Sequence, residues 1–414
     1  MTAAELSLAE GKALKAQLAR SQRRAKRRAF LLVLPLLAFV FLSFIVPIGQ
    51  MLYRSVHNDA FSANMPQLTA WFAANPAGTE PDEAAYAALA ADLASAAQAR
   101  TIGVVGTRVN YEMSGTRSLF TSAGRRADDL ATPFAQSVPA MNAGWASPEL
   151  WATMRNVSSP ITGNFYLAAL DRTRDLDGKI VAAPDERKIY IALFARTFIL
   201  SLAITGVCLL LAFPIAHLLA TLPMRYSNLL MILVLLPFWT SLLVRTTAWI
   251  AILQGQGVIN SLLVSLGLID EAGRLSLVYN QTGTIIAMTH ILLPFMVLPL
   301  YSVMRNIKPT YVRAARSLGA TSWTSFRRVY LPQTLPGIGA GSLLVFILAV
   351  GYYITPALVG GASGQLISNL IAFHMQNSLN WSLAAALAAL LLGVVILLYW
   401  TYDRLVGIDN MKLG

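Results

Sequence analysis

Charged residues are scarce in this chain of 414 residues. Asp, Glu, Lys and Arg together make up 13% of it, about half of the roughly 25% that is usual in soluble globular domains. Hydrophobic residues make up 56%, so much of the surface must face something other than water. This composition excludes an ordinary set of soluble domains and predicts an integral membrane protein.

Cysteine and the common catalytic motifs are also missing. The single cysteine, Cys208, lies in an apolar run, which excludes a disulfide framework and a structural zinc site. The four histidines are far apart in the sequence, and His217 and His290 are expected to be buried imidazoles with hydrogen-bond partners. No G-x-x-x-x-G-K-[ST], H-E-x-x-H or G-x-S-x-G pattern occurs. We therefore expect no metal site, no cofactor, no catalytic residue and no ATP hydrolysis by this chain alone.

The chain has instead six apolar stretches that are long enough to cross a membrane, which takes about 20 helical residues. None of them contains Asp or Glu before Asp403, which argues against an intramembrane enzyme. The prolines inside them predict kinks, because neighbouring helices can satisfy the carbonyls that a proline frees. The expected spans are Ala29–Tyr53, Ile189–Leu222, Asn228–Leu253, Gly283–Met304, Gly337–Val359 and Ser382–Tyr402.

Basic residues are distributed unevenly between the short loops. Four short segments hold 17 Lys and Arg, whereas the two on the opposite side hold one, Arg274. Because basic loops stay on the cytoplasmic side, we expect both termini in the cytoplasm. The net charge of +12 then orients the chain in a membrane and does not indicate a nucleic-acid partner. The basic segments are residues 1–28, 223–227, 305–336 and 403–414, and the other two are 254–282 and 360–381.

Residues 54–188 form a long insertion between the first two spans, expected on the outer, periplasmic side. The insertion has 12 basic and 14 acidic residues, and loops of this length cross the membrane largely regardless of charge. The Ala-rich stretch Asp82–Arg100 predicts a helix, and aromatic residues such as Trp145 and Trp151 are scattered through the segment. We expect a small folded domain. A disordered tether is the alternative, but aromatic residues are usually scarce in such tethers.

The most specific pattern lies between the fourth and fifth spans, from Arg313 to Pro332. Two small residues, Ala314 and Ala315, would let a short helix approach a partner surface closely. Gly319 can adopt a positive φ and turn the chain sharply. A basic amphipathic connector is the alternative interpretation of this segment.

The spacing of this segment resembles the loop of binding-protein-dependent ABC importer permeases. That loop has Glu-Ala-Ala, three residues, Gly, nine residues and Ile-x-Leu-Pro. The matches in register are Ala314, Ala315, Gly319, Leu331 and Pro332, while Val329 replaces Ile and Arg313 replaces Glu.

The resemblance implies an all-α fold of the type I importer permease kind, with six transmembrane helices and alternating access. It implies a cytoplasmic ABC ATPase subunit in two copies that docks on loop 305–336, a second homologous permease subunit and a periplasmic solute-binding protein. The expected location is the bacterial inner membrane. The expected segments are a cytoplasmic basic segment (1–28), a first helix (29–53), the periplasmic insertion (54–188), a five-helix core (189–405) and a cytoplasmic tail (406–414).

A narrower resemblance covers roughly residues 190–410. Three segments, Leu236–Trp249, Leu293–Tyr301 and Pro356–Gly361, are similar to the spermidine/putrescine permeases. This implies a polyamine or a related small cationic solute as the substrate. The alternatives are a permease for another small solute, such as an opine or an amino acid, and a membrane sensor or scaffold whose outer domain binds a ligand. The docking loop disfavours a channel.

A few polar and aromatic residues within the spans are candidates for the translocation pathway. Arg245 is a charge deep in the third span, and it must face the bundle interior or a water-filled cavity. It either lines the pathway or pairs with backbone carbonyls or the partner permease. The aromatic candidates, which either contact an ammonium substrate through their rings or serve packing, are Trp239, Trp249, Tyr352 and Tyr353. The pair Gly337 and Gly341 predicts close helix packing.

Overall fold

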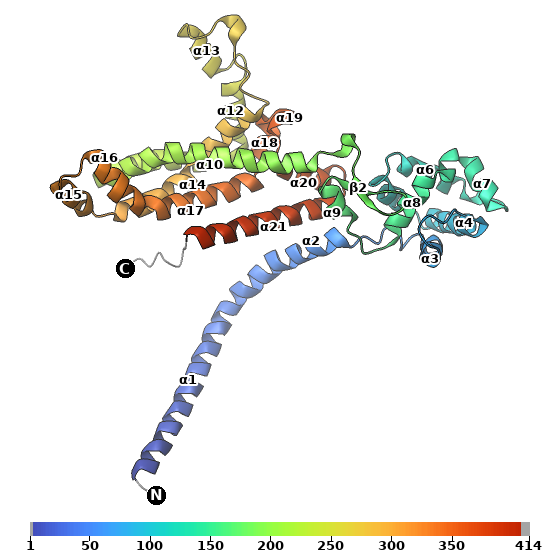
Figure 1. The fold of residues 1–414 in the computed structure, drawn as a ribbon, viewed down its shortest axis with the longest axis horizontal. Helices are drawn as coiled ribbons and strands as arrows, with labels where there is room; N and C mark the ends of the chain where they lie inside the picture. The colour runs from blue at the N-terminus through green and yellow to red at the C-terminus, as the bar shows by residue number, and fades with distance from the viewer. Residues whose placement is uncertain (1–2, 407–414) are drawn as a thin grey trace. The chain divides into compact units, whose positions relative to one another are not determined.

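The structure, a computed structural model, describes the backbone of residues 3–406 and the side chains of residues 21–404 (Figure 1). Within these residues the chain is helical apart from one short hairpin. It divides into two compact units, Met1–Arg54 and Ser55–Gly414, and each is described by itself. The side chains before residue 21 and the tail after residue 406, which belong to the predicted cytoplasmic ends, lie outside the described residues.

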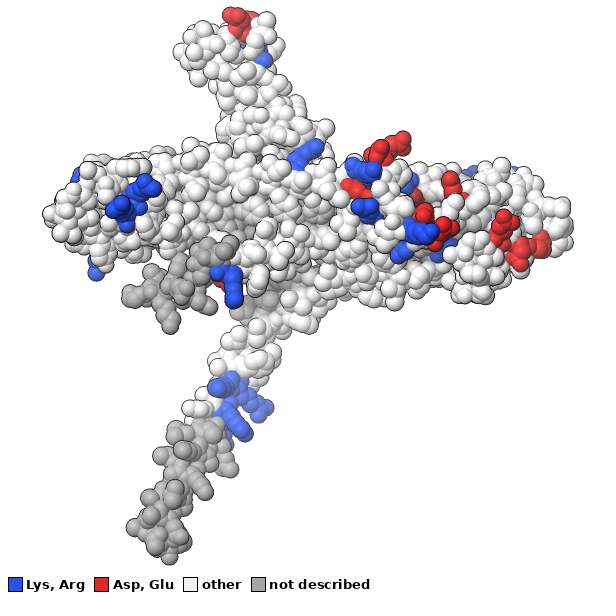
Figure 2. All heavy atoms as spheres, in the orientation of Figure 1, with Lys and Arg blue, Asp and Glu red and all other residues white. Residues whose placement is uncertain are grey.

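Six helices among the described residues are long and apolar enough to cross a membrane, which confirms the predicted number. In the face drawn in Figure 2 the bundle surface carries few charged side chains, while Lys and Arg gather at the end formed by the predicted docking loop. The low charge content of the sequence therefore belongs mainly to the bundle. The six helices span Ser21–Val56, Asp185–Thr221, Leu242–Ser265, Gln281–Asn306, Ser322–Gly351 and Trp381–Arg404.

The first unit is one continuous helix made of α1 (Ala3–Val40), a π-helical turn η1 (Phe41–Ile45) and α2 (Val46–Val56). Pro47 lies two residues after the end of the π-helical turn. A proline cannot donate to the carbonyl four residues earlier, and its ring crowds that carbonyl. The wider π turn accommodates this contact at Ser43 without ending the helix.

The insertion folds as a helical domain with its own core. Large apolar side chains such as Leu89, Leu93, Phe120, Trp145 and Met154 are buried there together. The predicted Ala-rich helix is α4, and Asp82 caps it by accepting from the N–H of Ala85. The helices are α3 (Pro66–Ala74), α4 (Glu83–Gln98), α5 (Ile102–Asn110), α6 (Thr116–Arg125), α7 (Phe134–Met141), α8 (Pro148–Ser158) and α9 (Asn164–Ala169). The 3-10 turns are η2 (Ala127–Asp129), η3 (Ala143–Ala146) and η4 (Asp185–Arg187), and β1 (Arg172–Arg174) pairs antiparallel with β2 (Ile180–Ala182).

Three long helices form the centre of the bundle and lie side by side in Figure 1: α10 (Tyr190–Thr221), α14 (Gln281–Asn306) and α17 (Leu331–Gly351). The close packing predicted for Gly337 and Gly341 is confirmed. A β-carbon on Gly337 would lie 3.1 Å from the Cβ of Val303, and one on Gly341 would lie 3.2 Å from the carbonyl oxygen of Met296. The two glycines therefore let α17 approach the backbone of α14.

The predicted third span, Asn228–Leu253, is not one helix, so this prediction is wrong. It joins a shorter apolar helix, Met224–Trp239, to the first part of the long helix Leu242–Ser265. The chain forms α11 (Met224–Leu235), a 3-10 turn η5 (Leu236–Trp239) and α12 (Leu242–Leu253). Pro237 cannot donate a backbone hydrogen bond, and Ser241 starts a new helix by accepting from the N–H of Val244. The break therefore lies at residues 240–241.

The fifth span is also displaced from the predicted Gly337–Val359. Its helix ends at Gly351, and Tyr352 and Tyr353 separate it from α18 (Ile354–Val359). Pro356 explains this second break, because its ring would crowd the carbonyl of Tyr352 in a continuous helix.

The fifth span also begins earlier than predicted. The short helix α16 (Ser322–Ser325) and the π-helical turn η7 (Phe326–Tyr330) run directly into α17, and this turn again precedes a proline, Pro332. The remaining elements are α13 (Val258–Ser265), η6 (Glu271–Gly273), α15 (Pro309–Ser317), α19 (Gly361–Gly364), α20 (Ile367–Gln376) and α21 (Trp381–Val406).

Candidate functional site

The predicted docking loop is a helix–turn–helix whose turn depends on Gly319. Its φ of 89° lies in the left-handed region, as predicted from the sequence. The N–H groups of Gly319 and Ala320 donate to the carbonyls of Arg316 and Ala315 at 3.0 and 3.1 Å. These bonds close the end of α15, and a residue with a β-carbon would adopt this backbone only with strain.

The surface of this loop combines apolar and basic side chains. Leu318 is 89% exposed and Trp323 is 67% exposed, and the guanidinium of Arg316 donates to the hydroxyl of Ser322, which joins α15 to α16. Arg313, in the position of the family's Glu, is exposed and forms no ion pair with a carboxylate among the described residues. Exposed apolar groups beside charges are typical of a surface that another protein covers.

The six residues predicted for docking are divided between two helices and a turn within loop 305–336. Arg313, Ala314 and Ala315 lie on α15, and Gly319 forms the turn. Leu331 and Pro332 lie in the first turn of α17, within the continuous helix Ser322–Gly351. The last two residues therefore belong to the helix of the fifth span.

The loop is attached to the inner bundle by specific contacts. The hydroxyl of Tyr330 lies 2.9 Å from Nδ1 of His217 on α10, and the rings of Phe326 and Phe213 meet edge to face at 6.1 Å. Arg305, at the end of α14, donates to the carbonyl of Ala220 at 2.9 Å. A displacement of the loop would therefore be transmitted to both α10 and α17.

The side chain of Arg245 turns back onto the break in the third span. Its Nη2 donates to the carbonyls of Pro237 and Thr240, the latter at 2.9 Å, and its Nε donates to the hydroxyl of Thr240 at 3.3 Å. Carbonyls at the end of a helix carry partial negative charge, and the carbonyl of Pro237 also accepts from the hydroxyl of Thr240 at 2.9 Å. Of the alternatives given above, the structure places Arg245 on backbone carbonyls.

The aromatic candidates in the third span lie in different surroundings. The Nε1 of Trp249 donates to Nδ1 of His290 at 3.1 Å, which joins α12 to α14. His217 and His290 both have hydrogen-bond partners as predicted, but their side chains are half-buried and not fully buried. Trp239, in contrast, is 79% exposed in this chain.

The break in the fifth span is closed by side chains from α20. The carbonyl of Tyr352 accepts from the hydroxyl of Ser368 at 2.6 Å, and that of Tyr353 accepts from Nδ2 of Asn369 at 2.7 Å. Just beyond it, the hydroxyl of Thr355 lies 3.3 Å from that of Thr246 on α12. The two breaks are therefore neighbours.

Sequence analysis did not identify Thr246, Thr355, Ser368 or Asn369. The signal that could have located them is the pair of prolines, Pro237 and Pro356, because polar side chains are expected where a break frees carbonyls within a membrane.

A cavity of about 330 Å³ lies between α10, α11 and α14. Apart from His290, its walls are apolar side chains. Pro237, whose carbonyl accepts from Arg245, forms part of the wall. The cavity therefore adjoins the break in the third span.

The insertion is joined to the helical bundle at the start of α10. The carboxylate of Asp171 accepts from the N–H groups of Ile189, Tyr190 and Ile191 at 2.9–3.1 Å, which caps the helix. The hydroxyl of Tyr111 donates to the carbonyl of Leu379 at 3.1 Å. The apolar contact between α9 and the end of the bundle includes Phe165, Ala169, Ile367, Leu383, Ala386 and Leu387.

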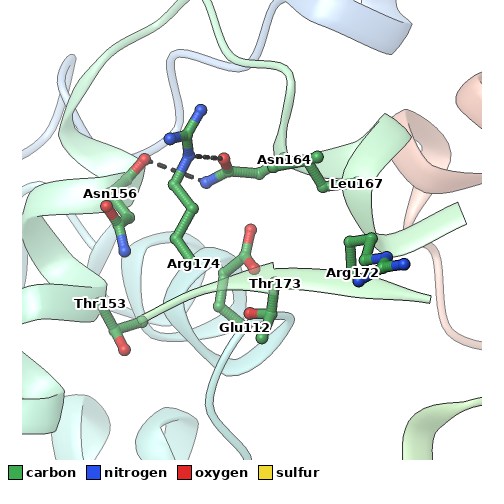
Figure 3. Close-up of a pocket in the computed structure, with 8 residues that line it drawn as sticks. All are labelled: Glu112, Thr153, Asn156, Asn164, Leu167, Arg172, Thr173 and Arg174. Atoms are coloured by element: carbon green, nitrogen blue, oxygen red, sulfur yellow. Dashed lines mark hydrogen bonds between the residues drawn. The ribbon is translucent and has the colours of Figure 1, made fainter. Parts of the chain in front are cut away.

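A polar cavity in the insertion is small and structural. It measures about 40 Å³, which is room for a few waters. Figure 3 shows Arg174 donating to Asn164, at 3.1 Å, and Asn164 donating to the carbonyl of Asn156, at 3.3 Å. These bonds use the polar groups of the cavity to hold α8, α9 and β1 together.

Burial shifts the pKa values of two charged groups in the insertion core. Burial lowers the pKa of Arg108, which is 1% exposed, and its ion pair with Glu112 at 3.2 Å opposes this shift. Burial raises the pKa of Asp92, and hydrogen bonds from the N–H groups of Leu68 and Gln67, at 2.8 and 3.3 Å, oppose it. No group of three potential metal ligands occurs among the residues that the structure describes.

Comparisons with known proteins agree with this architecture. Residues 209–406 match the family described as "Binding-protein-dependent transport system inner membrane component". The chain is 37% identical over 222 residues to the spermidine/putrescine transport system permease protein PotB of Escherichia coli K12, covering 53% of this chain and 80% of that protein. It is 33% identical over 226 residues to the inner membrane ABC transporter permease protein YdcU of the same organism, covering 51% of this chain and 70% of that one.

A solved structure, the bacterial alginate ABC transporter in complex with alginate pentasaccharide-bound periplasmic protein, is similar over 55% of this chain and 81% of that chain. The identity is 20% and the TM-score is 0.43. A similarity of this degree carries no argument about the substrate.

Proposed function

The chain belongs to the binding-protein-dependent transport system inner membrane components, and from this premise we propose that its substrate is a polyamine, spermidine or putrescine, or a related small cationic solute. It is a multi-pass permease subunit of an ABC importer in the inner membrane, and it does not itself hydrolyse ATP. The substrate proposal is supported mainly by the 37% identity to the spermidine/putrescine permease, of which 80% is covered.

The docking loop would receive the cytoplasmic ATPase subunit, present in two copies. Arg313, Ala314 and Ala315 would face it from α15, and Gly319 would set the turn. Leu331 and Pro332 would carry the resulting motion into α17. The exposure of Leu318 and Trp323 supports a covering partner, because such side chains are otherwise unfavourable at a cytoplasmic surface.

The remaining parts of the importer follow from the same proposal. A second homologous permease subunit would complete the pathway, and a periplasmic solute-binding protein would deliver the substrate. The 17-to-1 distribution of basic residues supports cytoplasmic termini and a periplasmic insertion at 54–188. The five-helix core, 189–405, would alternate between inward-open and outward-open states as the ATPase closes and opens.

The absence of acidic residues bears on how a cation would be selected. No Asp or Glu occurs in α10, α11, α12, α14 or α17. An uncompensated charge at membrane depth costs about 2.5–3.5 kcal/mol. We therefore assign most of the selectivity to the binding protein and the passage to carbonyls and aromatic faces, with Arg245, Trp239, Trp249, Tyr352 and Tyr353 as pathway candidates.

Transport by the reconstituted importer tests the substrate proposal. Proteoliposomes that contain this chain, its partner permease and the ATPase would receive the binding protein outside and ATP inside. Radiolabelled spermidine and putrescine should accumulate, and omission of ATP or of the binding protein should abolish accumulation. Accumulation of an opine or an amino acid without any polyamine uptake would contradict the proposal.

A further inference from the structure

The break in the third span places three hydrogen-bond acceptors around one cationic group. The acceptors are the carbonyls of Pro237 and Thr240 and the hydroxyl of Thr240, and the cation is the guanidinium of Arg245. We call the three acceptors the carbonyl cage. The 3-10 turn η5 ends here, so its last carbonyls carry the partial negative charge of a helix end.

The carbonyl cage is a place inside the spans where a cation is already stabilised without a carboxylate. Arg245 is half-buried, and no acidic residue occurs in α11 or α12. A guanidinium at this depth requires compensation, and the cage supplies it. The same acceptors would stabilise any other cation with several N–H groups.

The cavity beside the cage is lined mainly by apolar side chains and therefore suits an alkyl chain. It measures about 330 Å³, within the usual size of small-molecule sites, and Pro237 belongs to both features. Its other lining residues include Leu218, Leu233, Val234, His290 and Leu293. A ligand with a cationic head and a methylene chain would match the cage and the cavity together.

We propose that the carbonyl cage and the adjoining cavity bind an alkylammonium end of the transported solute, and that Arg245 is a tethered occupant which the solute displaces. The assignment rests on the proposed polyamine function. A primary ammonium group has three N–H donors, which equals the number of acceptors in the cage. Because two positive charges within one cage would repel each other, the ammonium and the guanidinium occupy the cage one at a time.

This arrangement gives Arg245 a second role besides closing a helix end. The carbonyl of Pro237 also accepts from the hydroxyl of Thr240 at 2.9 Å, so it keeps one partner when the guanidinium is displaced. When the solute leaves, the guanidinium returns to the carbonyl of Thr240, which would otherwise cost free energy as an unpaired group within the membrane. A merely structural arginine would stay in the cage whether or not the solute is present.

The first experiment leaves Arg245 in place. The complete importer, in nanodiscs of phosphatidylcholine and phosphatidylglycerol and without ATP or binding protein, is treated with phenylglyoxal, with and without putrescine. Mass spectrometry then gives the modification of Arg245 and of two controls, Arg196 and Arg305, each of which donates to one carbonyl. Putrescine should increase modification of Arg245 at least threefold and leave the controls unchanged. Equal modification with and without putrescine would overturn the proposal.

The second experiment tests whether the cage attracts cations after the side chain of Arg245 has been removed. Arg245→Cys in a Cys208→Ala background is treated with a cationic thiol reagent, 2-aminoethyl methanethiosulfonate, and with the anionic 2-sulfonatoethyl analogue. Thr247→Cys is the matched control, because Thr247 is exposed on the same helix and its hydroxyl bonds only within that helix. The ratio of cationic to anionic rates should be at least fivefold higher at 245 than at 247, and putrescine should slow labelling only at 245. Equal ratios without protection would overturn the proposal.

Two further measurements complete the test. One distinguishes a solute site from a lipid site, and the other distinguishes an error in the cage proposal from an error in the proposed function. If added phosphatidylethanolamine protects position 245 and putrescine does not, the occupant is a lipid headgroup and the proposal is wrong. The wild-type importer is tested for polyamine uptake in parallel. Uptake without any effect of putrescine at 245 refutes the cage and leaves the proposed function intact, whereas absence of polyamine uptake refutes the function itself.

Discussion

The hydroxyl groups of Thr246 and Thr355 lie 3.3 Å apart, just beyond the breaks in the third and fifth spans. Both side chains are fully buried. Thr246 also donates to the carbonyl of Leu242 at 2.9 Å, so Thr355 is the donor between the two hydroxyls. This bond links α12 to α18 and, together with the apolar cluster that includes Leu253 and Val359, holds the two breaks beside each other.

Thr355→Val should weaken the joint between the breaks. The substitution keeps the shape of the side chain but removes the donor, and a buried hydrogen bond contributes about 1 kcal/mol. We expect a lower thermal unfolding midpoint for the purified chain and a several-fold lower rate of solute uptake. Thr247→Val is the control, because its exposed hydroxyl bonds only to Leu243 in its own helix. If the two variants lose equal stability and activity, the bond between Thr355 and Thr246 does not join the breaks functionally.

The orientation can be tested with two single cysteines. Ser114 in the insertion and Ser317 at the end of α15 are both exposed. In a Cys208→Ala background, Ser114→Cys should react with an impermeant thiol reagent in intact spheroplasts, and Ser317→Cys should react only after permeabilisation. The reason is the strong bias of basic residues toward one set of loops. Labelling of both cysteines from outside would contradict the six-span topology.

Hydropathy was sufficient to predict six apolar helices but not the two breaks. A window of apolar residues reports the length of a span and not whether its backbone is continuous. Pro237 indicated a kink, whereas Pro356, near the end of the predicted fifth span, was not singled out. Whether a proline bends or ends a helix depends on groups that satisfy the freed carbonyls, and one of these, Ser368, lies 16 residues from Tyr352. Contacts of this kind depend on the tertiary structure and cannot be predicted from the local sequence around the proline.

The docking loop was the part of the site most accessible from sequence. Gly319 predicted a turn with positive φ because glycine lacks a β-carbon, and its φ is 89°. Two roles remained open for Arg245 from the sequence, because the residue type alone does not determine the direction in which a long side chain points. The cap of α10 by Asp171 was not predicted, since it joins residues 18 to 20 positions apart through a loop.

The stability of the insertion should depend on pH through Asp92. Burial raises the pKa of this carboxyl above its ordinary value of about 3.9. Between the unfolded and folded pKa values the folded state therefore binds more protons, so its stability falls as pH rises through this window. Hydrogen exchange of α3 and α4, corrected for intrinsic rates, should show more protection near pH 4 than near pH 7. Asp92→Asn should remove this difference, and an unchanged difference would point to another group.

Gly319→Asp should uncouple transport from ATP hydrolysis without preventing membrane insertion. A β-carbon at a φ of 89° costs about 1–2 kcal/mol of backbone strain. No atom lies within 4 Å of the added carbon, so the effect should come from the turn and from the new charge on a partner-facing surface. We expect normal amounts of protein in the membrane, reduced co-purification of the ATPase and at least tenfold lower uptake.

Gly78→Asp is the matched control for this prediction. Gly78 has a φ of 85° and also has no atom within 4 Å of an added β-carbon, but it lies in the insertion. The same strain and the same charge should therefore leave ATPase binding and uptake nearly unchanged. Since the two substitutions differ only in location, equal loss of uptake in both would attribute the effect to general destabilisation. Normal uptake and normal ATPase binding with Gly319→Asp would contradict a docking role for this turn.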